Sequence, residues 1–160
     1  MKKIKVGLAE IRLARAPDSL ISYGFGSCLG IAIVDPYAKV GGLAHALLAS
    51  QPGGNPSGNP LKYVDGAIEA MLAALAEAGC ARGALLAKTA GGAHMFEAVP
   101  RSGGSNIGER NARAAREKLE QLGIPLVAED VGGNYGRTIE LEPDDGTLVV
   151  RSLRMGIKRI

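Results

Sequence analysis

The sequence predicts an α+β or layered α/β fold, with a mixed sheet of about eight strands and two long helices on one face of that sheet. Short apolar runs cluster towards both ends of the chain, and two long helical stretches lie between them. Segments rich in Gly, Pro, Asn and Asp separate the runs, without the regular alternation of strand and helix that βαβ repeats require. With 160 residues, 46% of them hydrophobic, the chain is expected to form one domain over residues 1–160.

The first strands are expected before residue 50. Ile4, Val6 and Leu8 alternate with polar or small residues, which is the period of a half-buried strand. The apolar runs predict that this strand continues after a kink and that three more follow, over residues 11–13, 20–23, 28–35 and 40–48. Residues 51–60 contain three Pro and three Gly, so this segment predicts a loop or flap rather than regular structure.

Two helices dominate the centre of the chain. Apolar residues at helical spacing predict a helix over residues 63–78 that ends at Gly79. Asn106 is suited to cap a second helix over residues 107–122, which has a charged outer face. A flexible loop is expected over residues 100–105, and four more strands over residues 85–89, 124–128, 138–141 and 148–153.

Composition excludes several classes of protein. The net charge of +3 comes from interspersed acidic and basic residues, and aromatics make up only 4%, which disfavours a stacking platform for nucleic acid. Two cysteines do not form a disulfide framework, and no apolar run is long enough to enter a membrane. The positive N-terminus is not followed by an apolar signal region, so we expect a cytoplasmic protein without a leader.

The residues best suited to chemistry are Cys28 and His45. Cys28 follows a loop with glycine at positions 24 and 26, where the backbone can turn sharply and nearby N–H groups can face a ligand. A thiol and a histidine are the minimum for nucleophilic catalysis by cysteine. Both residues also fit an inert buried core, and His94 is an alternative base. No metal or other cofactor is expected, because the histidines and cysteines lack ligand spacing and no nucleotide-binding glycine motif is complete.

Five motifs occur in one order along the chain, from about residue 20 to residue 152. They are Gly26-Ser27-Cys28, His45-x-Leu47-Leu48, Gly91-Gly92-Ala93-x-Met95-Phe96, Asn106-Ile107-Gly108-x-Arg110-Asn111 and Glu129-Asp130-x-Gly132-Gly133-x-x-Gly136-Arg137. Together they resemble the CheD family of chemoreceptor glutamine deamidases. The resemblance implies a layered α/β/β fold and an enzyme that converts glutamine side chains of chemotaxis receptors to glutamate. It also implies receptor helices as partners, a CheC-type phosphatase as a partner of some members, and methylesterase activity in some.

The resemblance assigns the catalytic roles of nucleophile and base to Cys28 and His45. The third catalytic position, a threonine in the family, is occupied by Ser22. A serine hydroxyl can still orient the imidazole, although its rotamer is freer without the methyl group. We expect His45 to hold Cys28 as a thiolate, and the loop N–H groups around Gly26 and Ser27 to bind the oxyanion.

Three other functions remain compatible with the sequence. One is a non-catalytic chemotaxis module that binds receptors or a CheC-type phosphatase, which the change at Ser22 leaves open. The second is a different cysteine amidase or protease on a similar scaffold. The third is nucleic-acid binding, which the small positive net charge indicates only weakly.

Overall fold

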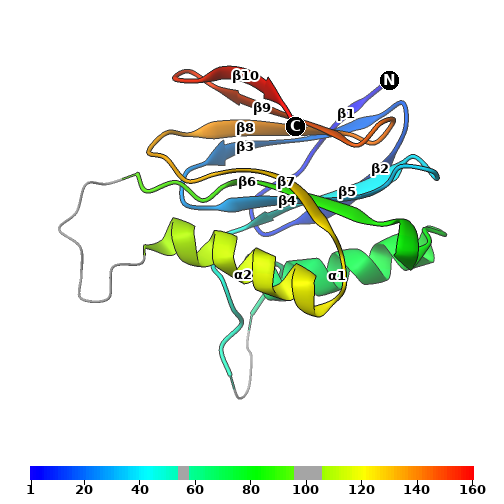
Figure 1. Cartoon of the computed structure of the whole chain (residues 1–160), viewed down its shortest axis with the longest axis horizontal. Coiled ribbons are helices and arrows are strands. Elements are labelled where there is room, and N and C mark those ends of the chain that lie inside the picture. The colour runs from blue at the N-terminus through cyan, green and yellow to red at the C-terminus, as the bar shows by residue number, and fades with distance from the viewer. Residues whose placement is uncertain (54–57, 96–105) are drawn as a thin grey trace.

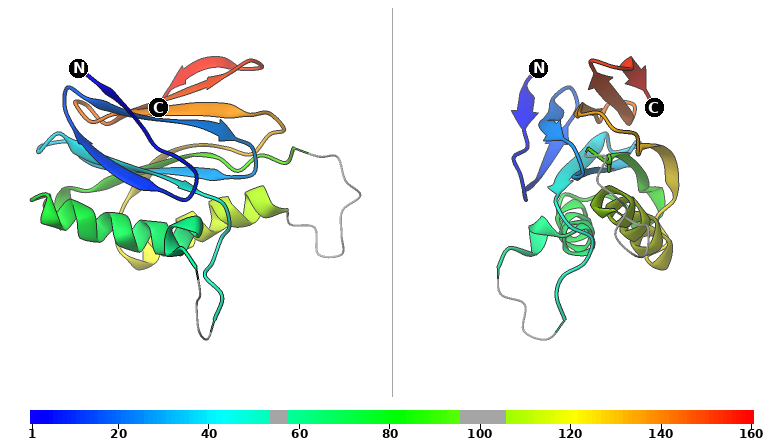
Figure 2. Two further views of the ribbon diagram at one scale, coloured as in Figure 1. Left: turned by 180° about the vertical axis from the view of Figure 1, so that it is seen from behind. Right: turned by 90° about the vertical axis from the view of Figure 1, so that its left-hand side faces the viewer.

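The computed structural model describes residues 1–53, 58–95 and 106–160. The predicted loop over residues 100–105 lies outside this range, as do residues 54–57 of the predicted flap. The described chain forms three layers, with two sheets stacked on each other and both helices on the outer face of one sheet (Figures 1 and 2). This arrangement confirms the expected α+β fold and its α/β/β layering.

Sheet A is the outer layer and has five strands. Their spatial order is β1 (Lys3–Lys5), β3 (Ser19–Phe25), β8 (Arg137–Glu142), β9 (Thr147–Ser152) and β10 (Gly156–Arg159). Sheet B is the central layer, with the order β2 (Ile11–Arg15), β5 (Val40–Ala46), β4 (Leu29–Asp35), β6 (Leu86–Gly91) and β7 (Leu126–Val131). Both sheets are mixed, because β1 pairs with β3 and β6 with β7 in parallel.

The described chain has ten strands in two sheets, not about eight strands in one. The expected first strand and its continuation are two separate strands, and they pair in different sheets. The last strand, β10, was not expected, because Ile157 is the only apolar side chain within it and it therefore contains no apolar run.

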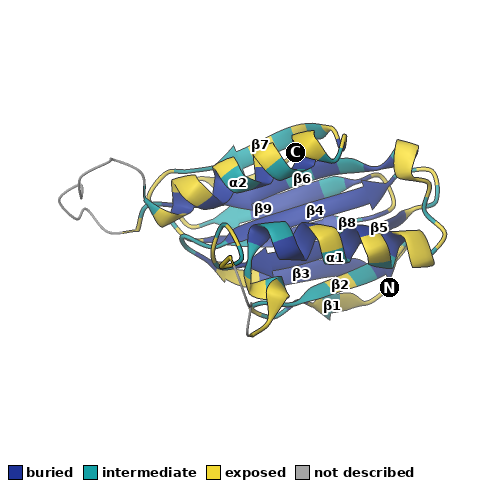
Figure 3. Ribbon diagram, turned by 90° about the horizontal axis from the view of Figure 1, so that it is seen from below, coloured by how far each residue is buried: buried dark blue, intermediate teal, exposed yellow. Residues whose placement is uncertain are grey.

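Both predicted helices are present. α1 (Val64–Glu77) and α2 (Ile107–Gln121) turn their buried faces to sheet B, as Figure 3 shows from the helix side. Asn106 caps α2 as predicted, with its side chain accepting from the Glu109 N–H. Two short 3-10 turns lie before α1 and before β6, over Pro60–Lys62 and Arg82–Ala84.

Sheet B contributes to two apolar cores. Alternate residues of its strands pack either on the helices or on sheet A, so that Ile31 and Ala44 face the helices while Ala32 and Leu43 face sheet A. This alternation decides which polar side chains reach the space between the sheets. No helix of the described residues is long and apolar enough to cross a membrane.

Candidate active site

Two of the three predicted catalytic residues lie on strands, and the third lies in the loop before another strand. Ser22 lies on β3 of sheet A, and His45 lies on β5 of sheet B. Two residues before His45, Leu43 packs in the core between the sheets, so His45 points into the same space. Both Ser22 and His45 are fully buried. Cys28 stands directly before β4.

A bulge in β3 turns two side chains towards His45. The register between β3 and β8 shifts between Ser22 and Phe25, and Gly24 has a φ of +78° within this step. Tyr23 and Gly24 are exposed, whereas Ser22 and Phe25 are buried. In a regular strand, residues three apart point to opposite faces. The bulge therefore explains how the glycine loop supplies two inward side chains.

The hydrogen bonds of Ser22 define the tautomer of His45. The Ser22 hydroxyl donates to the Val6 carbonyl at 2.7 Å, and Ser22 Oγ lies 2.8 Å from His45 Nδ1. A hydroxyl has one proton to donate, so Oγ must accept from Nδ1–H. The other ring nitrogen, Nε2, then carries a lone pair. Among the described residues Nε2 has no hydrogen-bond partner and is buried, so it is available as a base.

The ring of Phe25 covers one face of the imidazole. The centroids of Phe25 and His45 are 3.9 Å apart, and the rings are inclined by 16°. Gly30 makes room for this stack, since it pairs directly with His45 across β4 and β5. A Cβ at Gly30 would lie 3.2 Å from the Phe25 ring and 2.7 Å from Ile139 Cδ1. The sequence analysis did not identify Phe25 or Gly30 as site residues, and their spacing to His45 gives no signal for it.

Cys28 lies at the margin of the same inter-sheet space. It is two residues before Gly30 and therefore belongs on the face that Gly30 shares with His45, and it packs against the inter-sheet core. Burial raises the pKa of the Cys28 thiol, and its own backbone N–H partly offsets this rise. Burial also lowers the pKa of His45 to about 4. Both directions favour the neutral forms of the Cys28 thiol and the His45 imidazole.

The loop that carries Cys28 is fixed by neighbours on two elements. The Gly92 and Ala93 N–H groups, which follow β6, donate to the Cys28 and Gly26 carbonyls at 2.8 and 2.9 Å. The Asn111 side chain on α2 donates to the Ser27 carbonyl at 2.9 Å. Among the described residues, the N–H groups of Ser27 and Cys28 have no backbone carbonyl as a hydrogen-bond acceptor.

The last sequence motif surrounds a buried arginine. Arg137 donates to the carbonyls of Gly91 and Gly132 at 3.3 and 2.9 Å, and it pairs with Asp130 at 3.4 Å. It thereby joins the ends of β6 and β7 beside the Cys28 loop. His94, the alternative base, lies three residues after the end of β6, and its backbone N–H donates to the Gly133 carbonyl. Ser22 is hydrogen-bonded to His45 and not to His94.

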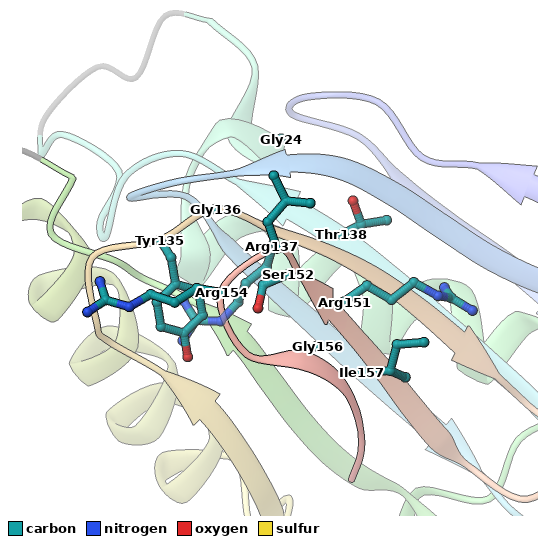
Figure 4. A pocket seen from close by; sticks show the side chains of 11 residues that line it. Gly24, Tyr135, Gly136, Arg137, Thr138, Arg151, Ser152, Arg154, Gly156 and Ile157 are labelled. Atoms are coloured by element: carbon teal, nitrogen blue, oxygen red, sulfur yellow. The ribbon is translucent and has the colours of Figure 1, made fainter.

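A separate hollow of about 620 Å³ lies by the β9–β10 hairpin of sheet A, and Figure 4 shows its lining. The Arg151 and Arg154 side chains extend in opposite directions there. Arg151 donates to Glu140 at 3.0 Å and Arg154 donates to Asn134. Because these arginines already have polar partners, the hollow offers no preformed site for an anion. The described residues also contain no cluster of His, Cys, Asp and Glu that could hold a metal.

Comparison with known proteins gives full-length relatives. A family model described as "CheD chemotactic sensory transduction" matches residues 47–152. A protein of Geobacter metallireducens named "Probable chemoreceptor glutamine deamidase CheD 2" is 48% identical over 99% of each chain. A "Probable chemoreceptor glutamine deamidase CheD" of Caldanaerobacter subterraneus is 44% identical over 99% of this chain and 98% of its own. The "Chemoreceptor glutamine deamidase CheD" of Bacillus licheniformis is 43% identical over 98% of this chain and 94% of its own.

Proposed function

Because this chain belongs to the CheD family, we propose that it hydrolyses specific glutamine side chains of chemotaxis receptors to glutamate and releases ammonia. The observation that carries this proposal is the buried lone pair on His45 Nε2, on the face that Cys28 shares. The names of the relatives suggest a chemoreceptor as the substrate, and the family resemblance implies that the glutamines lie on its cytoplasmic helices. Binding to a CheC-type phosphatase stays a prediction.

Cys28 is the nucleophile in this proposal. Its sulfur attacks the carbon of the glutamine side-chain amide, and the thiol proton passes to His45 Nε2 as the new bond forms. The sequence-based expectation was a thiolate already paired with an imidazolium. Burial shifts both pKa values towards the neutral forms, which favours transfer of the proton during attack.

The electrons of the amide C=O bond move onto its oxygen in this step. The Ser27 and Cys28 backbone N–H groups are the candidate donors to that oxyanion, a contribution commonly worth about 3–4 kcal/mol. The intermediate then collapses, the C–N bond breaks, and His45 gives its proton to the departing nitrogen. Ammonia leaves, and Cys28 is joined to the substrate through a thioester.

Hydrolysis of the thioester completes the cycle. His45 Nε2 accepts a proton from water, whose oxygen attacks the thioester carbon. The C–S bond breaks and Cys28 recovers its proton. Ser22 keeps Nδ1 protonated throughout, so that Nε2 alone exchanges protons. The product is glutamate, one charge more negative than glutamine.

The second candidate is a non-catalytic module that binds receptors. The raised pKa of the Cys28 thiol favours it, because a neutral thiol is a weak nucleophile. Alkylation separates the two candidates. If His45 assists Cys28, iodoacetamide should label Cys28 faster in the wild type than in His45→Gln at neutral pH. Equal rates, with the receptor fragment still bound, would favour the binding module.

The type of bond broken distinguishes a deamidase from a protease on the same scaffold. Incubation with a chemoreceptor cytoplasmic fragment should release ammonia and leave the fragment at full length. Shortened fragments without ammonia would instead identify a protease.

We also propose that residues 1–160 act as a single domain. The support is that sheet B contributes one face to the helix-side core and the other to the inter-sheet core. Limited proteolysis should therefore yield no stable fragment that contains only some of these layers.

A further inference from the structure

α2 buries one polar side chain near the Cys28 loop. The buried residues of this helix are small or apolar except for Asn111, which is fully buried. The Asn111 Nδ2 donates to two carbonyls, Ser27 O at 2.9 Å and Leu47 O at 3.0 Å. Its Oδ1 has no hydrogen-bond partner among the described residues.

The two acceptors fix which way the amide points. Carbonyl oxygens only accept, so the NH₂ group must face them, and both of its protons are used. In the described part of the chain the buried Oδ1 has no donor, and leaving a buried acceptor unpaired is unfavourable. An apolar side chain of similar shape would avoid this cost but could not donate. The contribution of Asn111 therefore lies in its two donated hydrogen bonds.

These two hydrogen bonds hold the backbone next to Cys28 and the backbone next to His45, the two residues proposed to react. Leu47 follows His45 by two residues on the chain that leaves β5, and Ser27 directly precedes Cys28. In a trans peptide the C=O and the next N–H point in opposite directions. With Ser27 C=O held by α2, the Cys28 N–H is turned away from the helix. The Gly92 N–H holds the next carbonyl, that of Cys28, at 2.8 Å.

We propose that Asn111 is a positioning residue, which holds the Ser27–Cys28 peptide so that the Cys28 N–H faces the developing oxyanion. This inference rests on the proposed deamidase function and adds a residue to its machinery. The partial positive charge of the NH₂ group also polarises the Ser27–Cys28 peptide, which makes the Cys28 N–H a better donor.

The test replaces Asn111 with Asp, which keeps the shape but puts a carboxylate where donors stood. Burial and the backbone N–H of Cys28 are the influences on the Cys28 pKa, so a new negative charge nearby would be unopposed. The rate at which iodoacetamide alkylates Cys28, measured as a function of pH, gives a labelling profile. This profile should move to higher pH by about one unit. The deamidation kcat should fall about tenfold or more, with KM changed less than about twofold.

Cys80 serves as an internal control for this measurement. It is a partly exposed cysteine beyond α1, and peptide mapping by mass spectrometry distinguishes it from Cys28. Its labelling profile should not move. Glu117→Gln is the matched control variant, because it also exchanges an amide and a carboxylate on α2, but at an exposed position.

Asn111→Ala removes the donors without adding a charge, so its kcat should fall as well, and this gives the test should Asn111→Asp not fold. A folded variant with wild-type kcat and an unmoved Cys28 profile would overturn the proposal. Equal changes in the labelling of Cys28 and Cys80 would do so too, because they indicate general loosening. If the wild type releases no ammonia, the deamidase function and the role of Asn111 fail together, whereas wild-type ammonia release with an unchanged kcat in the Asn111 variants overturns the role of Asn111 alone.

Discussion

Ser22 and His45 lie on strands of different sheets, and Ser22 Oγ is 2.8 Å from His45 Nδ1. The hydroxyl proton of Ser22 is committed to the Val6 carbonyl, which leaves Oγ to accept from the ring. By accepting this hydrogen bond, a single serine keeps the ring proton on Nδ1 and leaves the lone pair on Nε2. The threonine that the family places at this position is not required for this geometry.

We expect Ser22→Ala to lower kcat by about 10–100-fold, because Nδ1–H and the Val6 carbonyl would lose a buried partner each. Ser22→Thr keeps the hydroxyl and should retain activity. Steady-state deamidation of a receptor fragment by the two variants checks this prediction. Equal loss in both would point to packing at this buried position rather than to the hydrogen bond.

The burial of His45 predicts that the fold weakens in mild acid. The pKa of His45 is lowered from 6.5 to about 4, so the unfolded chain takes up a proton before the folded one does. The part of the folding stability that depends on neutral His45 is therefore fully present above pH 6.5 and is lost as the pH falls through 4. The loss is roughly 3 kcal/mol in the free energy of unfolding.

Urea unfolding at a series of pH values measures this loss. His45→Gln should lack the part of the pH dependence that lies between pH 6.5 and 4, while His94→Gln should keep it. A His45→Gln variant with the wild-type slope would show that other groups govern acid unfolding.

The stack of Phe25 on His45 predicts a cost for any side chain at Gly30. Gly30→Ala should destabilise the fold by about 1–3 kcal/mol, because the new methyl group must displace the Phe25 ring or Ile139. Since Phe25 also sets the ring plane of His45, kcat should fall as well. Gly83→Ala is the control, because a Cβ there meets nothing within 4 Å. Equal melting temperatures for both variants would contradict the packing argument.

The apolar patterns predicted both helices and most strands, and the family resemblance implied the layers. The catalytic roles of Cys28, His45 and Ser22 stay predictions. Apolar runs located β4 and β5, and helical spacing located both helices, because both kinds of pattern are visible in a short window of sequence. The glycine-rich approach to Cys28 correctly indicated a special backbone, which the structure shows to be the bulge at Gly24. The combination of motifs identified the family, which the comparisons confirm.

The other contacts of the candidate site could not be predicted, because they join residues that are far apart in the sequence. Nothing in the spacing of Phe25, Gly30 and His45 indicates a ring stack, because the stack exists only after sheet A packs on sheet B. The two carbonyls that Asn111 holds are 84 and 64 residues away in sequence. Burial, which favours the neutral forms of Cys28 and His45, likewise follows from the packing of layers and not from local sequence.

The most direct test of the account compares wild type and Cys28→Ala on a purified chemoreceptor cytoplasmic fragment. Peptide mass spectrometry reports whether particular glutamines have gained the mass difference between an amide and an acid, and an ammonia assay follows the same reaction. We predict that both signals occur with the wild type and that neither occurs with Cys28→Ala, although the variant folds normally. Deamidation at the wild-type rate by folded Cys28→Ala would contradict the account.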